Sequence, residues 1–280
     1  MRIKISSDST CDLSPAQVAA HDIAILPLTV TMDDKNYLDG VDIKHTDIYE
    51  NVAKTGKLPT TSANNVGQYM DAFEGFLKEY DAVIHFNISS GFSSCYQNAC
   101  LAAEEFENVY VVNSLNLSTG QGLLVLKAAE LAESGMAPQQ IVDEINETAL
   151  RVDASFILDT LEYLKKGGRC SAVAVLGANL LKLKPCIEVK DGKMGVGKKY
   201  RGAFEKCLRE YVTDRLADRE DLDLNRIFIT HSGVSKEWIN IAEETIRELQ
   251  PFKEICKTTA GCTVCSHCGP DTIGVLFIRK

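Results

Sequence analysis

The sequence has no apolar run close to the roughly 18 residues that a membrane-spanning helix requires. Its first ten residues, MRIKISSDST, turn polar after two alternating apolar positions, so the apolar core of a secretory signal peptide is also missing. Basic residues are too few for a nucleic-acid binder, because 30 Lys and Arg against 39 Asp and Glu give a net charge of −9. We therefore expect a cytoplasmic protein with no membrane span and no nucleic-acid partner.

Two signatures of catalysis are absent as well. No Gly-x-Ser-x-Gly elbow presents a nucleophilic serine, and no phosphate loop is available to hold ATP. The stretch SSGFSS has the wrong spacing for such an elbow, although its serines and two histidines keep a serine hydrolase as the weaker alternative. The residues concerned are Ser89, Ser90, Ser93, Ser94, His231 and His267.

Cysteine, by contrast, is plentiful. Ten cysteines without a signal peptide indicate free, largely buried thiols more than a disulfide framework. Cys262, Cys265 and Cys268 recur every third residue around His267, which could be a metal clip, a redox pair or part of a ligand pocket. Adjacent His267 and Cys268 cannot easily reach one tetrahedral ion, and a redox Cys-x-x-Cys pair requires a helix N-terminus after a strand. Metal binding and redox chemistry remain alternatives, and we expect neither a metal nor a cofactor.

The fold class follows from strands that alternate with helices. IAILPLTVTM reads as one buried strand, and the segments DAVIHFNIS and VYVVNS alternate with amphipathic helices, an order that favours a parallel sheet with crossover helices. Near residue 155 the pattern of predicted strands and helices changes. Further along, Asp191-Gly192 between extended segments predicts a hairpin. With 280 residues, two α/β domains are expected, at 1–155 and 156–280.

Hydroxyl-rich loops follow the strands of the first domain. SSDSTCDL, NISSGFSSCYQ and NSLNLSTGQG each stand where a predicted strand ends and a helix begins. Open α/β sheets bind ligands at that edge, and such loops offer hydroxyls and backbone N–H groups to an anion. Each loop taken singly is also explained as a set of helix caps.

A set of short motifs, in the order in which they occur along the chain, resembles the DegV family. They run from residue 6 to the last strand, so the resemblance covers essentially the whole chain. The motifs are SDST-x-D-L at Ser7, Y-x-DG at Tyr37, P-x-TS at Pro59, ISS-x-x-S-x-x-YQ at Ile88, S-x-G-x-G at Ser118, L-x-x-L-x-KGGR ending at Arg169, LL-x-x-KP at Leu180, DG at Asp191 and H-x-GP at His267.

The resemblance implies a bacterial fatty-acid-binding protein without catalytic residues or a cofactor. It implies two α/β domains, the first with a mainly parallel sheet and crossover helices, the second a mixed sheet with helices, and the ligand between the two. A long-chain fatty acid would lie in a buried tunnel, and its carboxyl group would be presented to a separate fatty acid kinase that forms the acyl phosphate. The chain would be the carrier.

The same resemblance assigns site residues. Thr61 and Ser62 stand in the TS turn, Ser93 matches the serine that faces the ligand head, and His267 matches the histidine of a closing loop. Arg169 and Arg201 match arginines associated with phosphate handling or kinase docking. Thr61, Ser93 and His267 are the residues expected to surround the carboxyl group of the ligand. The three cysteines beside His267 are then expected to have no role in binding it.

Overall fold

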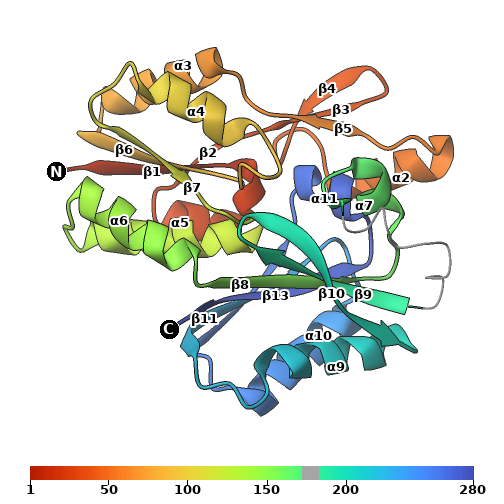
Figure 1. Ribbon diagram of the computed structural model, residues 1–280. Coiled ribbons are helices and arrows are strands. Elements are labelled where there is room, and N and C mark those ends of the chain that lie inside the picture. Colours follow the sequence, from red (N-terminus) through yellow and green to blue (C-terminus); the bar gives the residue numbers. More distant parts are fainter. Residues whose placement is uncertain (172–182) are drawn as a thin grey trace.

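The computed structural model describes residues 1–171 and 183–280 as three sheets with flanking helices (Figure 1). The strands are β1 (Ile3–Asp8), β2 (Ala24–Leu26), β3 (Thr29–Met32), β4 (Lys35–Leu38), β5 (Thr60–Ser62), β6 (Ala82–Asn87), β7 (Val109–Asn113), β8 (Val152–Leu158), β9 (Leu183–Lys190), β10 (Lys193–Arg201), β11 (Leu222–His231), β12 (Glu254–Thr259) and β13 (Thr272–Arg279). The helices are η1 (Ser9–Cys11), α1 (Pro15–Ala20), α2 (His45–Thr55), α3 (Val66–Leu77), α4 (Cys95–Ala103), α5 (Thr119–Glu133), α6 (Pro138–Ala149), α7 (Glu162–Gly167), α9 (Phe204–Leu216), α10 (Lys236–Leu249) and α11 (Cys262–Cys268). Across these described ranges, no helix is long and apolar enough to cross a bilayer.

The first sheet is parallel throughout and has the order β2-β1-β6-β7. Every residue of β6 is buried, as expected for a parallel strand that helices cover on both faces. Helices α3 and α4 lie on one face, and α5 and α6 lie on the other (Figure 1). The predicted parallel sheet with crossover helices is confirmed.

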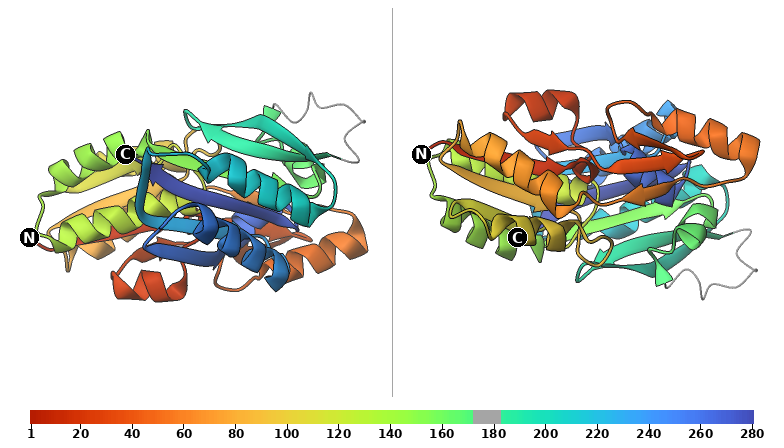
Figure 2. Two further views of the ribbon diagram at one scale, coloured as in Figure 1. Left: turned by 90° about the horizontal axis from the view of Figure 1, so that it is seen from below. Right: turned by 90° about the horizontal axis from the view of Figure 1, so that it is seen from above.

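The second sheet is mixed and has the order β10-β9-β8-β13-β11-β12. Only the pair β11 and β12 is parallel; the other neighbours in this sheet are antiparallel. Asp191 and Gly192 form the two-residue turn between β9 and β10, with φ angles of 50° and 73° that suit this dipeptide. Helices α9 and α10 cover the outer face of the sheet (Figure 2). The hairpin and the mixed second sheet are therefore as predicted.

The third sheet corrects the interpretation of IAILPLTVTM as one strand. Its first part is β2 in the parallel sheet, whereas its second part is β3, the centre of a small antiparallel sheet with the order β4-β3-β5. Pro27 lies between the two strands and lacks the N–H group that would continue a ladder. Strands β4, β5 and β12 were not predicted, since each is short or largely polar.

Helix α5 lies between the two large sheets and joins their cores (Figure 1). Its residues from Thr119 to Leu126 are all buried, so it has no solvent-facing side along this stretch. One cluster of buried side chains accordingly runs from Ile5 and Ile84 of the first sheet through α5 to Phe156 and Leu276 of the second. Residue 155, the expected domain boundary, lies inside β8, which pairs along its length with β13.

Candidate ligand-binding site

A pocket of about 210 Å³ brings together five of the six residues proposed from sequence. We call it the polar pocket. Its proposed residues come from β5, the loop between β6 and α4, the segment after α7, and α11. The pocket is lined by Leu28, Thr61, Ser62, Ala63, Ile88, Phe92, Ser93, Ser94, Arg169, Thr263 and His267.

His267 and Thr61 meet directly in this pocket. The hydroxyl oxygen of Thr61 lies 2.8 Å from Nε2 of His267, a hydrogen bond that the imidazole can donate or accept according to its tautomer. Burial, and to a lesser extent the Arg169 guanidinium, lowers the pKa of His267 to about 4. The ring is therefore neutral at pH 7 and can act as a neutral donor.

Ser93 and Arg169 complete the polar lining from two other segments. Ser93 Oγ accepts a hydrogen bond from the Cys95 backbone N–H at 3.3 Å and lies 3.0 Å from the Cys95 thiol. Arg169 is exposed at the rim and donates from Nη1 to the Gly167 carbonyl at 2.9 Å. Ser62 is also exposed, so the pocket combines a half-buried imidazole with an open, hydroxyl-lined edge.

Arg201 does not belong to this pocket. It is exposed at the end of β10 and is absent from the pocket lining. The motif at Leu180 to Pro185 is described only from Leu183 onward, at the start of β9, and its first three residues lie outside the described residues.

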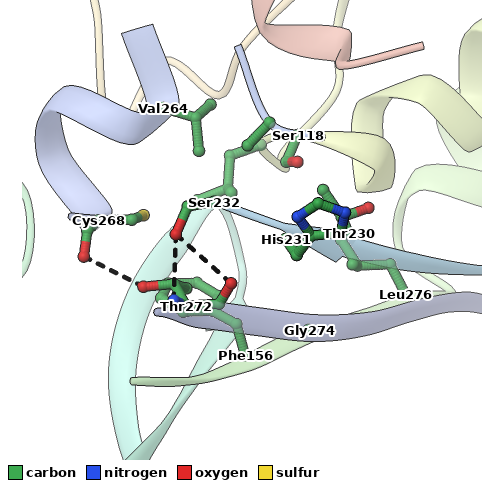
Figure 3. A pocket seen from close by; sticks show the side chains of 12 residues that line it. Ser118, Phe156, Thr230, His231, Ser232, Val264, Cys268, Thr272, Gly274 and Leu276 are labelled. Carbon is green, nitrogen blue, oxygen red and sulfur yellow. Dashed lines mark hydrogen bonds between the residues drawn. The ribbon is translucent and has the colours of Figure 1, made fainter. Parts of the chain in front are cut away.

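A second, apolar cavity lies between α11 and the strands β11 and β13 (Figure 3). Its volume is about 30 Å³, and Phe156, Leu276 and Leu117 contribute to a mainly apolar wall at the junction of α5 with the second sheet. Val264 and Cys268 of α11 face this cavity, whereas Thr263 and His267 face the polar pocket. Residues four apart share a face of a helix, so α11 presents one pair to each space.

The segment Cys262–Cys268 is a helix rather than the loop expected around His267. Its cysteines fill interior space, as Cys262 Sγ donates to the Ile43 carbonyl and Cys265 Sγ to the Ala260 carbonyl, each at 3.3 Å. Burial raises the pKa of the Cys262 and Cys268 thiols to about 12 and that of Cys265 well above its ordinary value. The Cys-x-x-Cys pair does follow a strand at a helix start, but its thiols are held protonated and lack the thiolate character of a redox pair.

Ser89 and the two histidines proposed for a hydrolase make contacts that do not form a catalytic triad. The buried Ser89 donates to the Gly192 carbonyl at 2.8 Å, which ties the β9–β10 turn to the loop that follows β6. His231 lines the apolar cavity, where its Nδ1 accepts a hydrogen bond from the Gly233 N–H. His267 Nδ1 is buried without a hydrogen-bond partner among the described residues, so no carboxylate there orients it as a general base.

Thr263 is the lining residue that sequence reasoning missed. It precedes His267 by four residues, which places both on one face of α11. That spacing would have identified Thr263 only if the segment had been read as a helix.

Fold and site together define an α/β protein with two large sheets and one small sheet, in which α11 lines both a polar pocket and an apolar cavity. The family model described as "Uncharacterised protein, DegV family" matches residues 2–280. A DegV domain-containing protein of Caldanaerobacter subterraneus is 33% identical over 281 residues, covering 100% of this chain and 99% of its own length. The chain belongs to the DegV family, as its motifs indicated.

Solved structures of the family share the whole architecture. A DegV family protein of Thermus thermophilus, described by its fatty acid binding, matches with a TM-score of 0.92 and 30% identity and is covered fully, as is this chain. A stearic-acid-binding protein of Eubacterium ventriosum matches with a TM-score of 0.84 and 28% identity, over 99% of this chain and 98% of that one.

Proposed function

We propose that this chain binds a long-chain fatty acid, with the carboxyl group in the polar pocket and the acyl chain in the apolar space beyond α11. The observation that carries the proposal is the convergence of Thr61, Ser93 and His267 from three separate segments on one pocket. The fatty acid binding described for the Thermus thermophilus relative and the stearic acid binding of the Eubacterium ventriosum relative support the same ligand class.

The polar pocket suits a carboxylate. The hydroxyl of Thr61 and the neutral imidazole of His267, 2.8 Å apart, can both turn toward one carboxyl oxygen, and the Ser93 hydroxyl lines the same pocket. Arg169 supplies the positive charge at the rim, where solvent screens it. Ser62, exposed beside Thr61, adds a further hydroxyl at the entrance.

The acyl chain would supply most of the binding free energy. Burying about 15 methylenes at ~0.8 kcal/mol each would contribute ~12 kcal/mol of favourable free energy. This is comparable to the ~4–15 kcal/mol of free energy that association costs. The apolar cavity of about 30 Å³ is far smaller than a tail needs, so side chains around it must separate when the chain enters. Phe156, Leu276 and Val264 line the cavity and are in position to move.

The second part of the proposal is presentation of the carboxyl group to a separate fatty acid kinase. The exposed Ser62, Ser94 and Arg169 leave the pocket open on one side, so that a carboxylate oxygen can attack the γ-phosphorus of ATP held by the partner, giving acyl phosphate and ADP. Arg201, exposed and outside the pocket, is proposed for docking this partner. The carrier supplies the acid and the kinase supplies the ATP site.

Fatty acid binding is tested first on the gently purified protein by native mass spectrometry, then by titrating delipidated protein with oleate. His267→Ala removes one hydrogen bond to a charged group, worth ~1.5–3 kcal/mol, and should weaken oleate binding by roughly 10- to 150-fold. His21→Ala, which alters a surface pair with Glu133, is the control and should bind oleate normally. Absence of a bound acyl chain together with no oleate affinity in the wild type would refute the carrier function.

The kinase role is tested with oleate-loaded protein, ATP and candidate kinases, with acyl phosphate as the product measured. The carrier alone should form none. Arg201→Ala should raise the KM for the loaded carrier and leave the oleate Kd unchanged, whereas Arg247→Ala, an exposed arginine paired with Glu243, should alter neither. An unchanged KM for Arg201→Ala would remove Arg201 from the docking surface.

A further inference from the structure

Thr263 carries a buried hydroxyl that has no partner among the described residues. Its side chain is 6% exposed, and its Oγ1 makes no hydrogen bond within the described part of the chain. Nearly all buried polar groups in proteins are hydrogen-bonded, so an exception requires an explanation. Thr263 lines the polar pocket, which suggests that its partner is a ligand.

The position of Thr263 at the start of the helix explains why α11 offers its hydroxyl no acceptor. A threonine or serine within a helix normally donates back to the carbonyl four residues earlier. The helical residues that do so here are Thr55, Thr148, Thr213, Thr245 and Ser266. For Thr263 that carbonyl belongs to Thr259, at the end of β12 and before the helix begins.

The backbone at Thr263 is held in place by Asp39. The Asp39 carboxylate is 2% exposed and accepts the Cys262 N–H at 2.6 Å and the Thr263 N–H at 3.1 Å. It also accepts the Ser9 hydroxyl at 2.8 Å, so three donors fix its orientation. Asp39 thereby closes the N-terminus of α11 and sets Thr263 one turn before His267.

We infer that Thr263 is a further ligand-binding residue, whose hydroxyl donates a hydrogen bond to the carboxyl group of the bound acid, with Asp39 as its positioning residue. The inference rests on the proposed function. Together with Thr61 and His267, Thr263 gives the carboxyl group donors from both β5 and α11, so the acid connects the small third sheet to this helix. Once the pocket opens around the acid, the hydroxyl gains an acceptor that it lacks among residues 1–171 and 183–280.

The test compares two identical substitutions. Thr263→Val replaces the unpartnered hydroxyl by a methyl group of the same shape, and Thr245→Val does so at a threonine that is 2% exposed and bonded to the Ile241 carbonyl. Oleate affinity of delipidated protein and the free energy of unfolding without ligand are measured for both. Thr263→Val should weaken oleate binding by about 10- to 100-fold with stability unchanged or raised, whereas Thr245→Val should keep its affinity and lose stability.

Thr263→Ser retains the hydroxyl and should restore oleate affinity to within a few-fold of the wild type. Wild-type affinity in Thr263→Val, with the wild type itself binding oleate, would overturn the assignment of Thr263 and leave the proposed function intact. A loss of stability in Thr263→Val as large as that in Thr245→Val would also overturn it, because the hydroxyl would then have a partner within the protein. No oleate binding by the wild type would overturn the proposed function together with this inference.

Discussion

At the scale of single residues, the surroundings of His267 in the polar pocket keep its imidazole uncharged at pH 7. Burial is the main cause of its low pKa of about 4, and the Arg169 guanidinium adds to it. A methyl group at Gly167 would lie 2.7 Å from Nδ1 of the ring, so this glycine lets α7 approach the imidazole closely. The ring is therefore neutral because it is buried, and it is held in position partly because α7 packs closely against it.

We predict that His267 makes folding stability fall in acid. Its pKa is about 4 in the folded protein and about 6.5 in the unfolded chain, so between these values the unfolded chain binds the extra proton. The contribution of His267 is therefore fully present above pH 6.5 and is lost as the pH falls toward 4. The free energy of unfolding of the wild type and of His267→Gln is measured in urea from pH 8 to pH 4. The difference between the two should be constant above pH 7. In acid the wild type should lose stability relative to the variant.

Asp12 acts in the opposite direction but is present in both proteins. Burial raises its pKa to about 8, so it contributes stability at low pH that is lost as the pH rises through 8. The difference between wild type and variant cancels this background. A difference that stays constant from pH 8 to pH 4 would show that the pKa of His267 is the same in the folded protein as in the unfolded chain.

At the scale of elements, α11 is a seven-residue helix whose first turn is capped by another part of the chain. Asp39, 223 residues before Cys262, accepts the first two helical N–H groups, and Asp12 accepts the Gly261 N–H at 2.8 Å. The buried carboxyl groups of Asp39 and Asp12 accept backbone N–H groups at the start of the helix and replace the side-chain cap that Gly261 cannot provide.

We predict that Asp39→Asn disorders the N-terminus of α11. The amide keeps one acceptor oxygen and turns an NH₂ group toward backbone donors, so at least one buried N–H loses its partner at a cost of about 1–3 kcal/mol. Unfolding in urea should show this loss, and the NMR signals of the His267 ring should shift while those of His21 do not. Asp34→Asn, at an exposed turn position, is the control and should change neither. An unmoved His267 signal would mean that Asp39 does not position this helix.

The elements that sequence reasoning predicted are those whose pattern is local. Buried runs such as β6 and the Asp191-Gly192 turn identify themselves. Helix α11 could not be predicted in this way, because Cys, Thr, Val, Ser and His are modest helix formers and the cap comes from Asp39. The grouping of Thr61, Ser93 and His267 followed from the family resemblance. The buried Thr263 hydroxyl, which has no partner among the described residues, could be recognised only from the structure.

At the scale of the whole molecule, the two large sheets are parts of one core. The buried cluster that includes Phe86, Leu124 and Phe228 crosses from one sheet to the other through α5. We propose that the two α/β units expected at 1–155 and 156–280 are structural halves that depend on each other for stability, with the ligand between them.

We predict a single cooperative unfolding transition. Trp238 is the one tryptophan of the chain and stacks on Phe204 at 4.1 Å between ring centroids, on the outer side of the second sheet. Its fluorescence therefore reports the second unit, while far-ultraviolet circular dichroism reports all helices. The two signals should give the same urea midpoint and slope in the absence of ligand. Separate midpoints would show that the units unfold independently despite α5.

The small size of the apolar cavity beside α11 also has a kinetic consequence. A space of about 30 Å³ cannot admit an acyl chain until packed side chains such as Phe156 and Leu276 move apart. Encounter with the proposed ligand is then followed by a slower opening step, and that step rather than diffusion sets the rate of capture at high fatty acid concentration. Release of the proposed ligand passes through the same opening, so the complex should be long-lived compared with one whose ligand lies on an open surface.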